Sequence, residues 1–209
     1  MGAYTAAHPA KRIPSLAKFA TMRRILPLAS CVALALASPR ADAQERPLGT
    51  LREQAQTRQE WLRLRLERVL PRLMREQDVG MWIVPVREYN EDPVFGSLVS
   101  PTTMAARRRT IYAFCDRGAA GVERVAIGGS PQGGLYRVVR DPDAAVGTAG
   151  PTVRPAEPFG PEQWRLLAPV VQACDPRSIA VDISHTHAFS DGLTAGEWEQ
   201  MQEALPAPY

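Results

Sequence analysis

The sequence predicts an α/β fold, in which helices flank a mixed sheet of about five strands. Short apolar segments rich in β-branched and aromatic residues are typical of strands and recur at 81–86, 109–114, 122–127, 135–139 and 179–183. Apolar residues at helical spacing predict helices within 50–74, 161–171 and 194–205. Along the chain the expected order is helix, two strands, a hairpin, helix, strand and helix, which indicates an α/β arrangement.

The first helix is expected to begin at Thr50, because Thr50-Leu51-Arg52-Glu53 has the form of a capping box. Its apolar stripe predicts a face packed on the sheet and consists of Leu62, Leu66, Val69, Leu70 and Leu73. Pro71 lacks the amide that would bond to Glu67, so the helix should kink or restart there.

The first four strands are expected within 81–139. The first is Met81 to Val86. Pro85 should lie at its end, because a strand paired on both sides uses every backbone N–H in hydrogen bonds and proline has none. Segments 122–127 and 135–139 are expected to form a hairpin joined by Gly128 to Gly134. The glycine run does not predict a phosphate site, because a strand follows it and lysine is absent.

The last part of the chain is expected to form a helix, a strand and a helix. Pro161 suits the first helical position, and a buried face follows at Trp164, Leu167, Ala168 and Val171. After the strand 179–183, Thr194-Ala195-Gly196-Glu197 repeats the capping-box pattern before a stripe of Trp198, Met201 and Leu205. Residues 141–160, rich in proline, glycine and alanine, predict a surface loop.

Composition fits a globular domain but does not indicate a nucleic-acid partner. The 209 residues are 45% hydrophobic and 22% charged, which allows a substantial core. Residues 1–43 carry a net charge of +5, so the rest of the chain carries −2 of the overall +3. The basic pI of about 9.0 therefore comes from the leader and predicts no nucleic-acid binding.

Residues 1–43 are expected to be a secretory signal peptide with an upstream extension, followed by one domain at 44–209. Met22-Arg23-Arg24 supplies the charged start, residues 25–37 the apolar run, and Ala41-Asp42-Ala43 a site for cleavage after Ala43. The run is shorter than the ~20 residues of a membrane span. We therefore expect a secreted or periplasmic protein that leaves the membrane after cleavage. A lipid anchor at Cys31 is the alternative.

The two cysteines of this domain, Cys115 and Cys174, leave two alternatives open. Export would place them in an oxidising compartment where they could form a disulfide. Free cysteine is, however, among the most buried residue types, and each lies beside a predicted strand or helix end. We expect two free, buried cysteines.

Candidate functional residues lie after the first strand. Glu88, Glu91 and Asp92 follow its carboxyl end, where open α/β sheets place ligand groups. Acidic loops are commonly only solvated, so location alone assigns no role. The basic run Arg107-Arg108-Arg109 is expected to be a solvated strand edge. The sequence holds no nucleophile motif, and we expect no catalytic residue in this chain.

His185 and His187 are weak metal-binding candidates. Their imidazoles would share one face if the last strand continued past Ile183. No third or fourth ligand is evident nearby, so we expect these histidines to face water or a neighbouring domain and we assign no metal site.

Together, these segments resemble the amino-terminal domain of the creatinase, prolidase and Xaa-Pro aminopeptidase family, the pita-bread metallopeptidases. The resemblance covers about Thr50 to Leu205. It rests on the 62–74 helix, Gly80-Met81-Trp82-Ile83-Val84-Pro85, Arg109-Thr110-Ile111-Tyr112-Ala113-Phe114, Ile179-Ala180-Val181-Asp182 and Ser190-Asp191-Gly192-Leu193-Thr194. Many members have an aromatic-leucine-threonine-glycine segment after the first strand, whereas this chain has Tyr89-Asn90-Glu91-Asp92-Pro93-Val94-Phe95.

The resemblance implies a creatinase amino-terminal fold with a ribonuclease H-like motif and a non-catalytic role. In that family the carboxyl-terminal domain binds two divalent metal ions through two aspartates, one histidine and two glutamates, and cleaves the bond before proline. This sequence holds no such domain, so the chain alone is expected to be inactive and to bind no cofactor. The implied roles are packing on the catalytic domain, homodimerisation and substrate restriction. Tyr89, Glu91 and Asp92 are the substrate-restricting candidates.

Two other functions remain open. An exported binding module would recognise a small molecule or a partner protein with the Tyr89 to Asp92 loop and have no peptidase partner. Such a module would be a monomer, whereas an accessory domain should expose an apolar patch for its partner. The third possibility is a metal-binding protein that uses His185 and His187.

Overall fold

The computed structural model describes residues 47–106, 108–140 and 161–209. The expected signal peptide with its cleavage site, the alternative anchor Cys31 and the expected 141–160 loop lie outside the described residues. The description therefore concerns the unit that runs from Arg46 to Tyr209. Within the described residues, no helix is long and apolar enough to cross a membrane.

The structure confirms an α/β fold. The helices are α2 (Leu51–Leu64), a π-helical turn (Arg65–Val69), α3 (Leu70–Glu76), α4 (Phe95–Leu98), α5 (Pro161–Cys174) and α6 (Ala195–Ala204), with short 3-10 turns at Gly118–Ala120 and Ala188–Ser190. The strands are β1 (Met81–Arg87), β2 (Arg109–Asp116), β3 (Val122–Ile127), β4 (Arg137–Val139) and β5 (Ile179–Val181).

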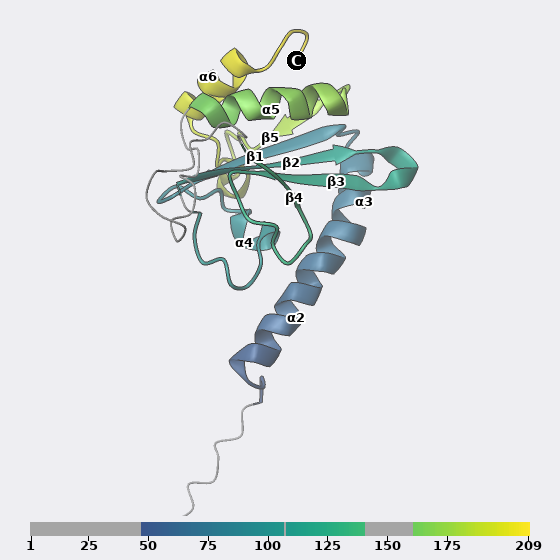
Figure 1. The fold of residues 1–209 in the computed structure, drawn as a ribbon, viewed down its shortest axis with the longest axis vertical. Coiled ribbons are helices and arrows are strands. Elements are labelled where there is room, and N and C mark those ends of the chain that lie inside the picture. The colour runs from purple at the N-terminus through teal and green to yellow at the C-terminus, as the bar shows by residue number, and fades with distance from the viewer. Residues whose placement is uncertain (1–46, 107, 141–160) are drawn as a thin grey trace, which may run out of the picture. The chain divides into compact units, whose positions relative to one another are not determined.

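The five strands form one mixed sheet in the order β4-β3-β2-β1-β5. The β1–β2 and β2–β3 pairs are antiparallel, and the β1–β5 and β3–β4 pairs are parallel. Helices α5 and α6 cover one face, and α3 and α4 lie on the other (Figure 1). Because β1 and β5 are adjacent and parallel, the loops that follow them leave the same edge of the sheet.

Side chains on the two central strands alternate between two apolar cores, as the period of a strand requires. On β1, Val84 and Val86 pack with the helices of the first part of the chain. Met81 and Ile83 instead pack with α5 and α6. Pro85 lies past the three residues of β1 that pair with β5, so its missing amide costs no ladder bond there.

The predicted start of the first helix is confirmed. The Thr50 hydroxyl accepts a hydrogen bond from the Glu53 backbone N–H at 3.3 Å, and the Glu53 carboxylate accepts one from the Thr50 N–H at 2.7 Å. The expected disturbance near Pro71 is also present, because Arg65–Val69 winds as a π-helical turn and α3 restarts at Leu70. Pro71 then occupies the first turn of α3, where a missing amide is tolerated.

The predicted hairpin between β3 and β4 is wrong. The two strands pair in parallel, with Val125 opposite Arg137, so residues 128–136 carry the chain back to the middle of β3. Two buried side chains hold this connection: the Tyr136 hydroxyl donates to the Leu98 carbonyl at 2.8 Å, and the Gln132 carboxamide accepts from the Ser100 N–H at 2.8 Å. Gly133 and Gly134 have positive φ and allow the reversal.

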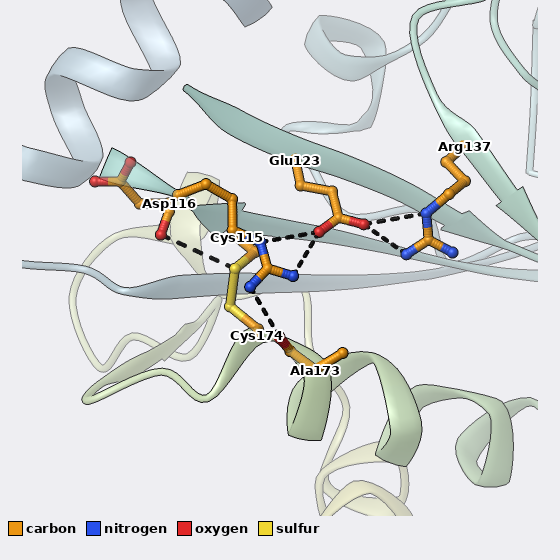
Figure 2. Close-up of polar contacts among 7 residues, drawn as sticks. Cys115, Asp116, Glu123, Arg137, Ala173 and Cys174 are labelled. Atoms are coloured by element: carbon orange, nitrogen blue, oxygen red, sulfur yellow. Dashed lines mark hydrogen bonds and ion pairs between the residues drawn. A yellow bond between two sulfur atoms is a disulfide. The ribbon is translucent and has the colours of Figure 1, made fainter. Parts of the chain in front are cut away.

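The expected free cysteines are also corrected, because Cys115 and Cys174 form a disulfide. The bond joins the end of β2 to the end of α5, and Figure 2 shows it beside the Glu123–Arg137 ion pair. Arg117 supports the same contact: it pairs with Glu123 and donates to the Ala173 carbonyl at 2.8 Å. The helix end is therefore held by the disulfide and by this hydrogen bond.

Arg109, expected in a solvated edge, is buried at the start of β2. Its guanidinium lies 3.2 Å from the Glu197 carboxylate of α6 and 5.2 Å from the centre of the Trp164 ring of α5. Because both charged side chains are at most one-tenth exposed, this ion pair joins β2 to α6 through a desolvated contact.

Candidate functional site at the carboxyl edge of the sheet

The predicted acidic loop follows β1, and its residues lie in different surroundings. Tyr89 is at the tip of a tight turn in which the Asn90 N–H donates to the Arg87 carbonyl at 2.9 Å. Its φ is 66° and its side chain is 94% exposed. A phenol ring this open to water has no packing role within the described residues.

The two glutamates of the loop bind backbone groups. Glu91 accepts a hydrogen bond from the Ala106 N–H at 3.1 Å, and Glu88 accepts one from the Arg108 N–H at 3.4 Å. Both contacts hold the loop after β1 against the segment that leads into β2. Glu91 therefore contributes to loop geometry, and its substrate-restricting role stays a prediction.

Asp92 is buried and meets a second carboxyl that the sequence analysis did not single out as functional. Asp92 is 2% exposed, and Asp182, directly after β5, is 8% exposed. Each carboxyl shifts the pKa of the other, so the two side chains lie close enough to interact. The Trp82 indole N–H donates to Asp182 at 2.8 Å, and the Val94 N–H donates to Asp92 at the same distance. The structure thus brings two carboxyls together across the β1–β5 edge.

Burial is the main cause of the unusual protonation of this pair. It raises the pKa of Asp182 to about 7, and the neighbouring Asp92 charge adds to the rise, while the Trp82 hydrogen bond opposes it. Burial also raises the pKa of Asp92, against hydrogen bonds from Val94 and Asp182 that lower it. Asp182 accordingly carries a proton in slightly acidic solution.

The loops after β1 and β5 touch at Gly192. A Cβ atom at this position would overlap the Asp92 carboxylate, so only glycine fits beside the buried side chain. The adjoining Leu193 N–H donates to the Asp182 carbonyl at 3.0 Å. The two carboxyls and Gly192 therefore form one contact between the two loops.

The histidine candidates lie in the second loop. Strand β5 ends at Val181, so the continued strand that would align His185 and His187 is absent from this described segment. Both side chains are exposed, and the His187 backbone N–H donates to the Ser184 hydroxyl at 3.0 Å. Across the described residues, no group of three or more histidine, cysteine or acidic side chains is arranged to hold a metal ion.

Both of these loops carry large exposed apolar side chains. Tyr89 lies on the first, and Phe189 and Ile183, with exposed fractions of 85% and 44%, lie on the second. Large exposed apolar groups on adjoining segments are typical of a protein contact surface. We call Tyr89, Ile183 and Phe189 the edge-loop surface.

A separate cavity of about 540 Å³ lies beside β5. Its walls include Ile179 and Val181 of β5 and Trp198 and Met201 of α6, with Leu205 just beyond the helix. Strand β5 is last in the sheet order and pairs only with β1 among the described strands. An apolar hollow beside a free strand edge can accept an extended peptide.

The carboxyl pair was accessible in part from sequence. Asp182 lies within the last predicted strand, and a strand parallel to β1 would put it at the same edge as Asp92. The parallel pairing was the missing information, because sequence pattern does not specify strand neighbours.

The chain was compared with protein-family models, curated proteins and solved structures, and none of them matches it.

Proposed function

We propose that this chain is the exported, non-catalytic amino-terminal accessory domain of an Xaa-Pro aminopeptidase-like metallopeptidase. It packs on a carboxyl-terminal pita-bread catalytic domain, contributes to a homodimer and restricts the substrate. The catalytic domain supplies two divalent metal ions and the hydrolytic chemistry. The observation that carries the proposal is the edge-loop surface, which suits docking on another domain.

The composition of this surface supports docking. The aromatic side chains Tyr89 and Phe189 are almost fully exposed, and aromatic groups are enriched in the cores of protein contacts. The exposed polar residues His185, His187 and Asp191 lie on the same loop as Phe189. Protein interfaces commonly combine apolar side chains with polar ones.

The disulfide supports export. Cys115 and Cys174 are paired, and disulfides persist mainly in secreted and periplasmic proteins. This observation agrees with the predicted cleavage after Ala43.

Sedimentation velocity of the purified chain, together with binding of an apolar fluorescent dye, tests the docking role. Without its catalytic partner, the chain should self-associate at micromolar concentration and bind the dye. The variant Tyr89→Ser/Phe189→Ser should do neither. The matched control Leu51→Ser/Trp61→Ser removes two exposed apolar side chains from α2, 83% and 58% exposed, and should behave like the wild type.

Two results would contradict the docking role. The first is a wild-type chain that remains monomeric and binds no dye at 100 µM or about that concentration, well above typical transient affinities. The second is an equal loss of self-association in the α2 control, which would assign the effect to general surface hydrophobicity.

The cavity beside β5 favours a second candidate, an exported binding module without a peptidase partner. Its volume of about 540 Å³ lies within the range of ligand clefts. The module would add an extended apolar peptide to the free edge of β5 and seat a side chain against Trp198. A monomeric chain whose β5 amides become protected from hydrogen exchange by an acetylated Val-Ile-Val amide would favour it. Unchanged β5 exchange at millimolar peptide would exclude this mode.

A further inference from the structure

The buried carboxyl pair joins two segments far apart in sequence. Asp92 belongs to the loop after β1, and Asp182 directly follows β5. No other described contact between these loops combines two ionisable groups with almost complete burial. Asp92 is 2% exposed and Asp182 is 8% exposed. The state of this pair therefore bears directly on whether the loops stay together.

The hydrogen-bond pattern requires a proton between the two side chains. Asp92 Oδ1 receives the Val94 N–H, whereas Asp92 Oδ2 is buried and receives no N–H or O–H from any other described residue when both carboxyls are charged. The ionisable side chain that interacts with Asp92 is the Asp182 carboxyl. Two carboxylates offer only acceptors, so Asp182 satisfies Asp92 only when it carries a proton.

Among the described residues, no positively charged group shifts the pKa of either carboxyl. The Trp82 indole approaches from β1 and Gly192 from the loop after β5, and neither is ionisable. The other ionisable side chains on these loops are directed elsewhere. Glu88 binds the Arg108 N–H, Glu91 binds the Ala106 N–H and Asp191 binds the Ser184 N–H, whereas Tyr89, His185 and His187 are exposed. None of them is among the described groups that shift the protonation of either carboxyl.

We propose that Asp92 and Asp182 form a proton-operated clasp that holds the loop after β1 to the loop after β5 and loosens when the shared proton is lost. The two loops carry the edge-loop surface, so the clasp controls the order of that surface. Its consequence for docking rests on the proposed function, whereas its effect on loop opening does not.

The direction of the effect follows from proton linkage. Burial raises the pKa of Asp182 to about 7 in the closed state, whereas an exposed aspartate has a pKa near its ordinary value of about 4. The shared proton stabilises the closed loops fully below pH ~4, and this stabilisation is lost as the pH rises through about 7. The opening equilibrium should rise about tenfold per pH unit between these values and level off above pH ~7.

Hydrogen exchange with mass spectrometry on the full chain tests the clasp. After correction for intrinsic exchange rates, opening of peptides from residues 88–98 and 183–193 should rise roughly tenfold between pH 6 and pH 8 in the wild type. Asp182→Asn imitates the protonated carboxyl, since its amide can donate to Asp92 while its oxygen accepts from Trp82. Its loop opening should be independent of pH.

A matched control is available in the same loop. Asp191→Asn changes an exposed carboxyl that binds only the Ser184 N–H among the described contacts, and it should retain the wild-type pH profile. Wild-type loops whose opening does not change from pH 6 to pH 8 would overturn the clasp, whether or not Asp182→Asn folds. An unchanged pH profile in a folded Asp182→Asn chain would also overturn it. Loss of docking with the exchange profile intact would overturn only the proposed function.

Discussion

Removing the disulfide should cost a large part of the stability of this domain. The perturbation is Cys115→Ala/Cys174→Ala, with alanine chosen because Cys115 is buried and a serine hydroxyl there would need a partner. The two cysteines are 59 residues apart in sequence. A cross-link that closes a loop of this length lowers the entropy of the unfolded chain and stabilises the fold by about 4 kcal/mol.

The folded state should change little, which makes the prediction specific. In the variant, Arg117 still donates to the Ala173 carbonyl and still pairs with Glu123, so the end of α5 remains attached to β2. A loss of about 4 kcal/mol compares with the 5–15 kcal/mol that typical domains possess, so the variant should remain folded at room temperature but with a small margin.

Urea unfolding followed by circular dichroism measures the effect. The variant should lose about 4 kcal/mol of unfolding free energy and should expose more surface on unfolding, seen as a larger denaturant slope. Wild-type protein treated with a phosphine reductant should show a similar loss, whereas the reductant should not affect the variant. A loss below about 1 kcal/mol would refute the idea that this cross-link restricts the unfolded chain.

Two further substitutions test other buried contacts by the same unfolding measurement. Arg109→Met leaves Glu197 buried without its partner and should cost about 3–5 kcal/mol; adding Glu197→Leu should recover part of this loss, and strictly additive losses would contradict the ion pair. Gly192→Ala should cost about 1–3 kcal/mol by overlap with the Asp92 carboxylate. The cost should shrink in an Asp92→Ala background, and equal costs in both backgrounds would exclude that overlap as the cause.

Much of the fold could be predicted because local pattern and burial agree along most of the chain. The predicted stripe of the first helices is buried at Leu62, Leu66 and Leu70. It is wrong at Val69 and Leu73, which are 39% and 46% exposed. The capping box at Thr50 uses only residues within one turn, so its geometry follows from sequence. Features determined by residues close together in the chain can therefore be predicted from the sequence.

The features that could not be predicted depend on contacts between distant segments. Glycines between β3 and β4 fit a hairpin equally well, and the parallel pairing is associated with the buried anchors Gln132 and Tyr136. The position of Cys174 beside Cys115 depends on how α5 crosses the sheet. Asp92 and Asp182 become a pair only once β5 lies beside β1.

An assay for peptidase activity is the most direct test of the proposed accessory role. Purified chain, prepared from a host that lacks its own prolidase, is incubated with Mn²⁺ and Xaa-Pro dipeptides, and release of free proline is followed over hours. We expect no release above a control without the chain. Release that scales with the concentration of the chain and persists through successive purification steps would contradict the proposal that hydrolysis belongs to a separate catalytic domain.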